Sequence, residues 1–319
     1  MKTKTIKEIK TIINNNNSFL ITSHYSPDGD ALGSVIALGL LLKKLHKEVF
    51  YHIDRAFADK YSFLTDIEDL KNNIDHQKFD VGICLDCGDL NHLFGSEALD
   101  RCSKIVNIDH HKSNTLFGTV NYVDIEASAT GEIIYELLEH FKISLNIEMA
   151  IALYTAIVTD TGNFKYSNTT SKTHLIVSNL LRHSFKHWEI NKKLFDEHKK
   201  TKILLMGETI KNLNFYFDGK IALSILTQAE IKELGALDED VEGLINIGRD
   251  ISGVEVSVFI KETKPSEYKV GFRSNNYVDV GEIALELGGG GHSRAAGCTI
   301  LGNKDEIINN IINILSKKI

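Results

Sequence analysis

Short apolar runs alternate with helix-like segments through the first half of this chain, and this alternation restricts its fold more than any other feature. The runs at 18–23, 48–53, 81–85 and 105–108 have the length and apolar content of buried strands. Segments 31–45, 129–141 and 147–158 instead place apolar residues at helical spacing. We therefore predict an α/β domain with a mostly parallel sheet that is flanked by helices.

A second pattern follows a polar, charged stretch at 182–202 and indicates a smaller C-terminal domain of mixed α/β type. Strands are predicted at 221–226, 254–260 and 268–272, and helices at 279–287 and 307–315. With 319 residues the chain is long enough for two domains of ordinary size. We expect one domain at 1–181, a connecting helix or linker at 182–206 and a second domain at 207–319.

The composition excludes several classes of protein. A net charge of −7 provides no overall positive field for gripping long duplexes, although the acidic excess could serve solubility alone. No apolar run is long enough to span a bilayer, and the polar run 14–17 stands where a signal peptide would have its apolar core. We expect a cytoplasmic protein with no membrane partner.

Two of the four cysteines, Cys84 and Cys87, form a C-x-x-C pair that raises the question of redox chemistry or zinc binding. The chain has no second such pair, and Cys84 lies in the apolar run 81–85. A small thiol packs well in such a run, so we predict buried structural cysteines.

Carboxylates and imidazoles follow the predicted strands and one predicted helix at the points where these elements end. They are His24, Asp28, Asp30, Asp86, Asp109, His110, His111 and Asp160. The carboxyl ends of parallel strands meet at one edge of a sheet, so these side chains should converge there. Buried carboxylates cost several kcal/mol each unless they are paired or metal-bound, and no comparable set of Lys or Arg accompanies them. We predict a site for two divalent cations, and mixed His and Asp ligands suit Mn²⁺ better than Mg²⁺.

These residues resemble the motifs of the DHH phosphoesterase superfamily. HYSPDGD at 24–30 is similar to its first motif, H-x-x-x-D-x-D; Asp86 fits the second motif, 109–111 the third and Asp160 in VTDTG the fourth. GGGGHSRAAG at 288–297, with GFRS at 271–274, resembles the companion DHHA1 substrate-binding domain. The resemblance spans nearly the whole chain, and it looks greatest to small bacterial members described as oligoribonucleases and pAp phosphatases.

The resemblance implies a role for each motif residue. One metal would bind His24, Asp28 and Asp86, and the second Asp30, Asp86, His110 and Asp160, with Asp86 bridging. Mn²⁺ is expected, with Mg²⁺ and Co²⁺ as alternatives. The two remaining residues are implied to be catalytic: Asp109 would support the ligands and His111 would face the substrate phosphate.

The candidate substrate-binding residues of the second domain are Arg273, Ser274, Gly289, Gly290, Gly291, His292 and Arg294. Arg294 departs from the family pattern, in which a less charged residue is expected at this position. Glycines can adopt backbone angles that let successive N–H groups surround an anion, and a guanidinium binds phosphate with two hydrogen bonds. A flexible loop at a helix end is the alternative interpretation of the glycine run. For Arg273 and Arg294 the alternative is a solvated surface arginine.

The implied activity is hydrolysis of short oligoribonucleotides to mononucleotides, with removal of the 3′-phosphate of pAp at the same site. The implied partners are short single-stranded RNA or DNA and pAp, and a homodimer is compatible with such a chain. Three alternatives stay open: hydrolysis of linear dinucleotides from cyclic-dinucleotide signalling, an inorganic pyrophosphatase, and a catalytically inactive nucleotide-binding module. The sequence leaves the direction of digestion, the native metal and the preference for RNA or DNA undecided.

Overall fold

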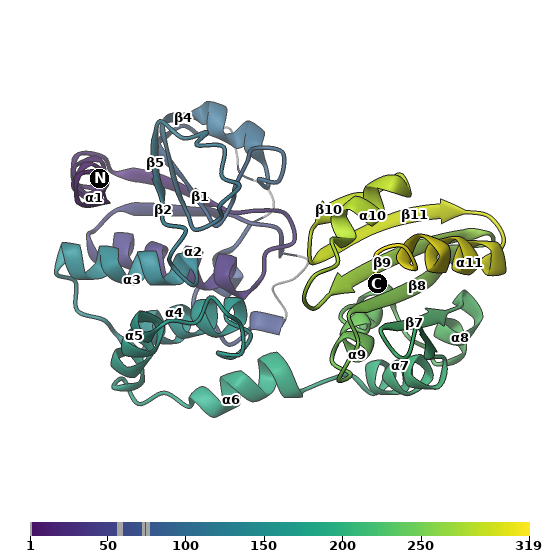
Figure 1. Cartoon of the computed structure of the whole chain (residues 1–319). Coiled ribbons are helices and arrows are strands. Elements are labelled where there is room, and N and C mark those ends of the chain that lie inside the picture. Colours follow the sequence, from purple (N-terminus) through teal and green to yellow (C-terminus); the bar gives the residue numbers. More distant parts are fainter. Residues whose placement is uncertain (1, 56–59, 72–73, 75–76) are drawn as a thin grey trace. The chain divides into compact units, whose positions relative to one another are not determined.

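The computed structural model describes residues 2–55, 60–71, 74 and 77–319, and the chain divides into two compact units, Met1–Glu197 and His198–Ile319 (Figure 1). The stretch expected to connect two domains holds α6 (His187–Asn191), a π-helical turn (Lys192–Asp196) and the start of α7 (Lys200–Lys211). The boundary between the units therefore falls inside this stretch. Among the described residues no helix has the length and apolarity to cross a membrane.

The first unit is built on a five-stranded parallel sheet in the order β2-β1-β3-β4-β5. Its strands are β1 (Ser18–Thr22), β2 (Glu48–His52), β3 (Phe79–Leu85), β4 (Cys102–Asp109) and β5 (Val120–Val123). All four strands predicted here are present, and the predicted parallel α/β architecture is confirmed. The strand β5 and the first helix, α1 (Lys2–Asn15), were not predicted from the sequence.

Helices α2 (Gly29–Lys44), α3 (Thr130–Phe141), α4 (Ile147–Asp160) and α5 (Ser171–Leu181) accompany this sheet (Figure 1). Helix α2 is buried along nearly its whole length, which explains why its sequence is apolar on every side. A Cβ added at Gly33 would lie 2.3 Å from the Ala152 carbonyl oxygen, so glycine allows α2 and α4 to pack closely. The large core formed by these elements holds the carboxyl ends of the strands in place.

The cysteines of the C-x-x-C pair lie in a small apolar cluster of unit 1. Cys84 and Cys87 are buried there with Leu93 and Leu99, the latter from the 3₁₀ helix η3 (Ser96–Arg101). Burial raises the pKa of the Cys87 thiol to about 12 and that of Cys84 well above its ordinary value. Both environments suit structural thiols.

The second unit has a six-stranded mixed sheet in the order β10-β11-β9-β8-β7-β6, in which only β7 and β8 are parallel neighbours. Its strands are β6 (Asn214–Tyr216), β7 (Ile221–Leu226), β8 (Val256–Lys264), β9 (Glu267–Ser274), β10 (Gly290–His292) and β11 (Ala295–Leu301). Its remaining helices are α8 (Gln228–Glu233), α9 (Ile245–Arg249), α10 (Val280–Glu286) and α11 (Lys304–Leu315). The mixed α/β pattern predicted for this half is confirmed.

The glycine-rich segment of unit 2 is a hairpin and not an open loop. Gly290 pairs with Gly297 and His292 with Ala295 in the antiparallel β10–β11 ladder. A Cβ at Gly289 would lie 2.2 Å from the Gly297 carbonyl oxygen, and one at Gly291 would lie 2.5 Å from the Ala296 Cα. Glycine is therefore required here for close packing of one chain segment on another.

Candidate metal centre

The proposed ligands and the two predicted catalytic residues lie at the carboxyl edge of the parallel sheet, each at or just beyond an end of an element. His24 follows β1, Asp28 is the N-cap of α2, Asp30 lies in its first turn, Asp86 follows β3, Asp109 ends β4, His110 and His111 come next, and Asp160 ends α4. Helix α2 begins where it does because the Asp28 carboxylate accepts the N–H groups of Asp30 and Ala31. The predicted convergence at one sheet edge is therefore present in the structure.

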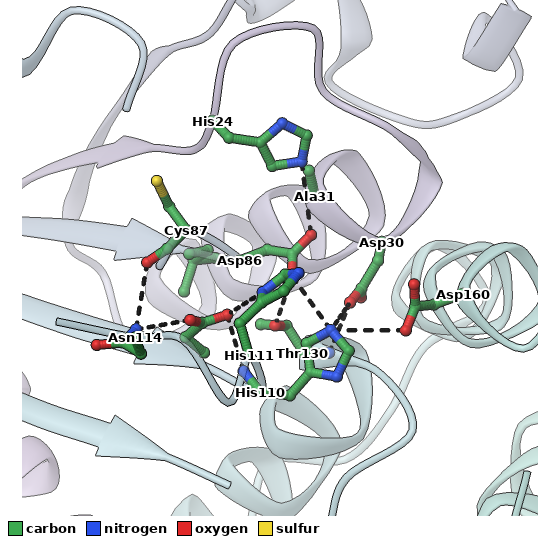
Figure 2. A network of polar contacts seen from close by, with 12 residues as sticks. His24, Asp30, Ala31, Asp86, Cys87, His110, His111, Asn114, Thr130 and Asp160 are labelled. Atoms are coloured by element: carbon green, nitrogen blue, oxygen red, sulfur yellow. Dashed lines mark hydrogen bonds and ion pairs between the residues drawn. The ribbon is translucent and has the colours of Figure 1, made fainter. Parts of the chain in front are cut away.

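Seven of these residues form three groups, each with ligand atoms within 4.8 Å of one another (Figure 2). The groups are His24–Asp28–Asp86, Asp30–His110–Asp160 and Asp86–His110–His111. The first is the ligand set implied for one metal, and the second holds three of the four ligands implied for the other. The third group connects the other two, because it shares Asp86 with the first and His110 with the second.

The spacing of these atoms suits ligands of a common cation. His110 Nε2 lies 3.8 Å from Asp30 Oδ2, 3.6 Å from Asp86 Oδ1 and 3.5 Å from Asp160 Oδ2. His24 Nε2 lies 3.7 Å from Asp86 Oδ2. These distances exceed ordinary hydrogen bonds, but two atoms that each bind one ion at about 2.0–2.2 Å are commonly separated by such distances. The donor set therefore fits divalent cations.

The charges at the site also favour cations. Within the described part of the chain, none of its aspartates forms an ion pair with Lys or Arg. Burial and the neighbouring Asp86 charge raise the pKa of Asp28 and, more strongly, of Asp30, and burial raises that of Asp160 to about 6. Burial acts in the same direction on Asp86, but its contacts with the three histidines lower its pKa. The repulsion among these carboxylates is what a bound cation would relieve.

The start of α3 holds two of the proposed ligands in position, which the sequence analysis missed. The N–H groups of Thr130 and Gly131 donate to the Asp30 carboxylate at 2.6 and 2.9 Å, and Ser34 Oγ donates to it at 3.0 Å. Thr130 Oγ1 donates to Asp86 Oδ1 at 3.0 Å. Free N–H groups at the first turn of a helix favour carboxylates. One signal could have indicated this contact. Helix α3 begins after Ala129, which has no side chain that can cap it, so its first N–H groups need acceptors from elsewhere in the chain.

A second missed residue, Asn114, supports His111. His111 Nδ1 donates to Asp109 Oδ1 at 2.7 Å, and Asn114 Nδ2 donates to Asp109 Oδ2 at 2.6 Å (Figure 2). Asp109 is fully buried, whereas the His111 side chain is 48% exposed. The hydrogen bond to Asp109 raises the pKa of His111 to about 9. A carboxylate only accepts, so Nδ1 carries the proton and Nε2 is left for another partner.

In unit 2, the predicted substrate-binding residues lie at the end of β9 and in the β10–β11 hairpin. Arg273 Nη1 donates to the neighbouring Phe272 carbonyl oxygen, and His292 is exposed. The N–H groups of Gly288 and Gly289 donate to carbonyl oxygens of α10, so they have acceptors within the chain. Binding of substrate by these residues stays a prediction.

Arg294 has structural partners. Its Nη1 donates to Ser274 Oγ at 3.1 Å and to the Val278 carbonyl oxygen at 3.0 Å. Ser274 Oγ in turn donates to Glu255, a buried carboxylate that also accepts the N–H groups of residues 276–278. Glu255 was not predicted, and it organises the turn that follows β9.

Comparisons with known proteins agree with this geometry. The family model described as "DHH family, N-terminal domain" matches residues 18–157, and the "DHHA1 domain" model matches residues 219–317. The first match includes every residue of the metal centre except Asp160, and the second covers unit 2 from just before β7 to just beyond the end of α11.

Curated relatives and one solved structure match over most of the chain. A Thermus thermophilus protein named "Bifunctional oligoribonuclease and PAP phosphatase NrnA" is 32% identical over 88% of this chain and 84% of its own length. A Bacillus subtilis protein of the same name is 28% identical over 94% of this chain and 93% of its own. The structure of an exopolyphosphatase-related protein from Bacteroides fragilis matches with a TM-score of 0.90 and 27% identity, covering 99% of this chain and 96% of that one.

Proposed function

We propose a reaction for this chain, which belongs to the DHH family: hydrolysis of short oligoribonucleotides to mononucleotides, with pAp as a second substrate. One observation carries the proposal: the two ligand groups are adjacent. Asp86 of the first group lies 3.6 Å from His110 of the second. A pair of cation sites that share a carboxylate suits phosphoester cleavage. The names of the curated relatives supply the substrate class.

The residues of these two groups would hold two divalent cations, with Asp86 shared between them. The chemistry that such a pair supplies when bound is neutralisation of the phosphate oxygens and a lower pKa for a water molecule. We propose Mn²⁺ as the native ion because imidazole and carboxylate ligands occur together.

The other polar residues of the centre orient the groups that would contact the phosphate or the cations. Asp109 and Asn114 fix the His111 ring, so that His111 Nε2 can donate a hydrogen bond to a phosphate oxygen. The buried hydrogen bonds from Thr130 and Gly131 keep the Asp30 carboxylate directed at the cluster without a neutralising side chain. Because these groups are already oriented, little reorganisation is needed when a phosphate binds.

We propose that unit 2 contributes substrate binding, with Arg273 as the phosphate-binding residue. Its guanidinium is only partly exposed, and it makes no ion pair with a carboxylate within the described residues. We assign Arg294 and Ser274 to holding the turn beside it, on the basis of their hydrogen bonds.

One assay tests the proposal. The purified chain, with Mn²⁺, is given a 5′-phosphorylated diribonucleotide, a long single-stranded RNA, pAp and pyrophosphate. We expect rapid release of mononucleotides from the dinucleotide, slow attack on the long RNA, and conversion of pAp to AMP. Turnover of pyrophosphate alone would contradict the proposed substrates, and nucleotide binding without turnover in any divalent metal would indicate an inactive module.

A further inference from the structure

Unit 1 has a few exposed aromatic side chains, and two of them lie in chain segments that carry proposed metal ligands. Among the described residues of this unit, the large exposed aromatics are Tyr25, Tyr166 and Trp188, at 52, 53 and 58% exposure. Tyr25 directly follows His24, and Tyr166 lies six residues after Asp160. Two of the three therefore belong to segments that carry proposed ligands, one from each of the two connected groups.

Tyr25 is held rigidly although its ring is exposed. Its N–H donates to the His92 carbonyl oxygen at 2.8 Å, and its own carbonyl oxygen accepts from His24 Nδ1 at 2.7 Å. Its ring meets Phe94 in an edge-to-face contact, with centroids 5.3 Å apart. The backbone of Tyr25 thus fixes the orientation of His24, while the ring remains accessible beside it.

Tyr166 is supported from one side by a glycine. A Cβ added at Gly162 would lie 2.4–2.6 Å from Tyr166 Cζ, Cε1 and Cε2, so the ring rests directly on the Gly162 backbone. The Tyr166 N–H donates to the Thr161 carbonyl oxygen at 3.0 Å, and Thr161 directly follows Asp160. With one face of the ring covered and half of the residue exposed, the other face is open to solvent.

Neither ring has a polar partner in the described part of the chain. Within the described residues, neither tyrosine hydroxyl forms a hydrogen bond, and neither residue belongs to a core cluster. A rigid, half-supported aromatic ring beside a phosphate-binding site is the arrangement by which proteins bind unpaired nucleobases. Every base has a π-face, so stacking of this kind accepts any sequence.

We propose that Tyr25 and Tyr166 each stack on a nucleobase next to the scissile phosphate, one from each end of the metal centre. The proposal rests on the proposed phosphodiesterase function, because a phosphodiester carries one nucleoside on each side of its phosphate. It assigns to unit 1 the recognition of the bases, which the metal ligands do not provide.

The test measures binding without turnover. The probe is a 5′-phosphorylated purine diribonucleotide with a non-hydrolysable methylene phosphonate linkage, compared by calorimetry in Ca²⁺ with analogues that lack one or the other base. Tyr25→Leu and Tyr166→Leu should each raise the Kd of the two-base probe roughly tenfold. Each variant should bind the analogue that lacks its own base as the wild type does.

Two controls separate stacking from a structural role. Trp188→Leu removes an equally exposed aromatic that lies far along the chain from the ligand segments, and it should leave every Kd unchanged. Tyr25→Phe and Tyr166→Phe keep a ring and should restore tight binding of the two-base probe. An equal loss for all probes, or no loss, would overturn the proposal.

The outcome is distinguishable from failure of the proposed function. A wild type that binds the two-base probe through these rings, but cleaves no phosphodiester in Mn²⁺, would refute the function and leave the stacking sites standing. A wild type that cleaves dinucleotides, with leucine variants that bind normally, would refute the stacking sites alone.

Discussion

Carboxylates are used in opposite ways in the two units of this chain. In unit 1, Asp30 and Asp86 are buried beside other carboxylates and histidines, with separations that leave room for ions. In unit 2, Glu255 is equally buried but accepts hydrogen bonds from backbone N–H groups, from Ser274 and from Asn276. The same chemical group therefore lies among like charges as a candidate ligand in one place, and is a structural anchor for a turn in the other.

The difference appears in the direction of the pKa shifts. Burial with neighbouring negative charge raises the pKa of Asp30, whereas for Glu255 the hydrogen bonds outweigh burial and lower the pKa. The charged form is thus disfavoured for Asp30 and favoured for Glu255 in the folded chain. Each prediction below tests one side of this contrast.

Asp86→Asn should have the largest effect on turnover. Because Asp86 lies in two of the three ligand groups, its loss should reduce kcat by roughly 1,000-fold or more, since metal ions contribute several kcal/mol to such reactions. Because contacts with three histidines favour the charged form of Asp86, its neutralisation should also lower the thermal midpoint of the metal-free protein. Asp80→Asn, in the same strand, is the control: Asp80 accepts the N–H groups of Asn17 and Ser18, so turnover should persist. Near-normal turnover in Asp86→Asn would show that the ligand assignment is wrong.

Asn114→Ala should have an intermediate effect. It removes the hydrogen bond to Asp109 that helps to orient His111, and losses of supporting groups around metal sites typically cost about 10–100-fold. The loss should appear in kcat with little change in KM, measured on a 5′-phosphorylated diribonucleotide. A change confined to KM would place Asn114 in substrate binding instead.

Glu255→Gln should change binding and stability, but not the chemical step. The amide cannot accept all the N–H groups that meet the carboxylate, so the turn after β9 should loosen and unfolding should require about 1–3 kcal/mol less. We expect a several-fold higher KM with kcat nearly unchanged. A loss of kcat that matched Asp86→Asn would remove the contrast between the two carboxylates.

Metal removal should reveal the smallest effect, a pH dependence of stability in unit 1. Asp160 has a pKa raised from 3.8 to about 6, so it binds its proton more tightly in the folded chain. Its contribution to stability is complete below 3.8 and is lost as pH rises through about 6. The thermal midpoint of chelator-treated protein should therefore fall over this range by more than that of metal-free Asp160→Asn. At pH values above 6, added Mn²⁺ should raise the thermal midpoint, because cations and protons compete for the same carboxylate oxygens.

Much of the centre could be predicted because its ligands stand at the ends of regular elements. The apolar runs identified β1, β3 and β4, and parallel pairing brings their carboxyl ends to one edge whatever lies between them. The positions of Asp86 and Asp109 follow directly from that rule. The glycine-rich hairpin could not be recognised in this way, because its first strand, β10, has only three residues, two of them glycine, and so carries no periodic pattern.

The sequence by itself therefore determined the parallel sheet, the two-domain composition and the identity of the candidate ligands. The tertiary structure alone decided what holds those ligands: Thr130 and Gly131 reach Asp30 across about a hundred residues, and Arg294 reaches Ser274 across twenty. Periodicity and motif spacing report on neighbours along one element. A hydrogen bond between distant segments depends on how whole elements pack, and that is set by the core that surrounds them.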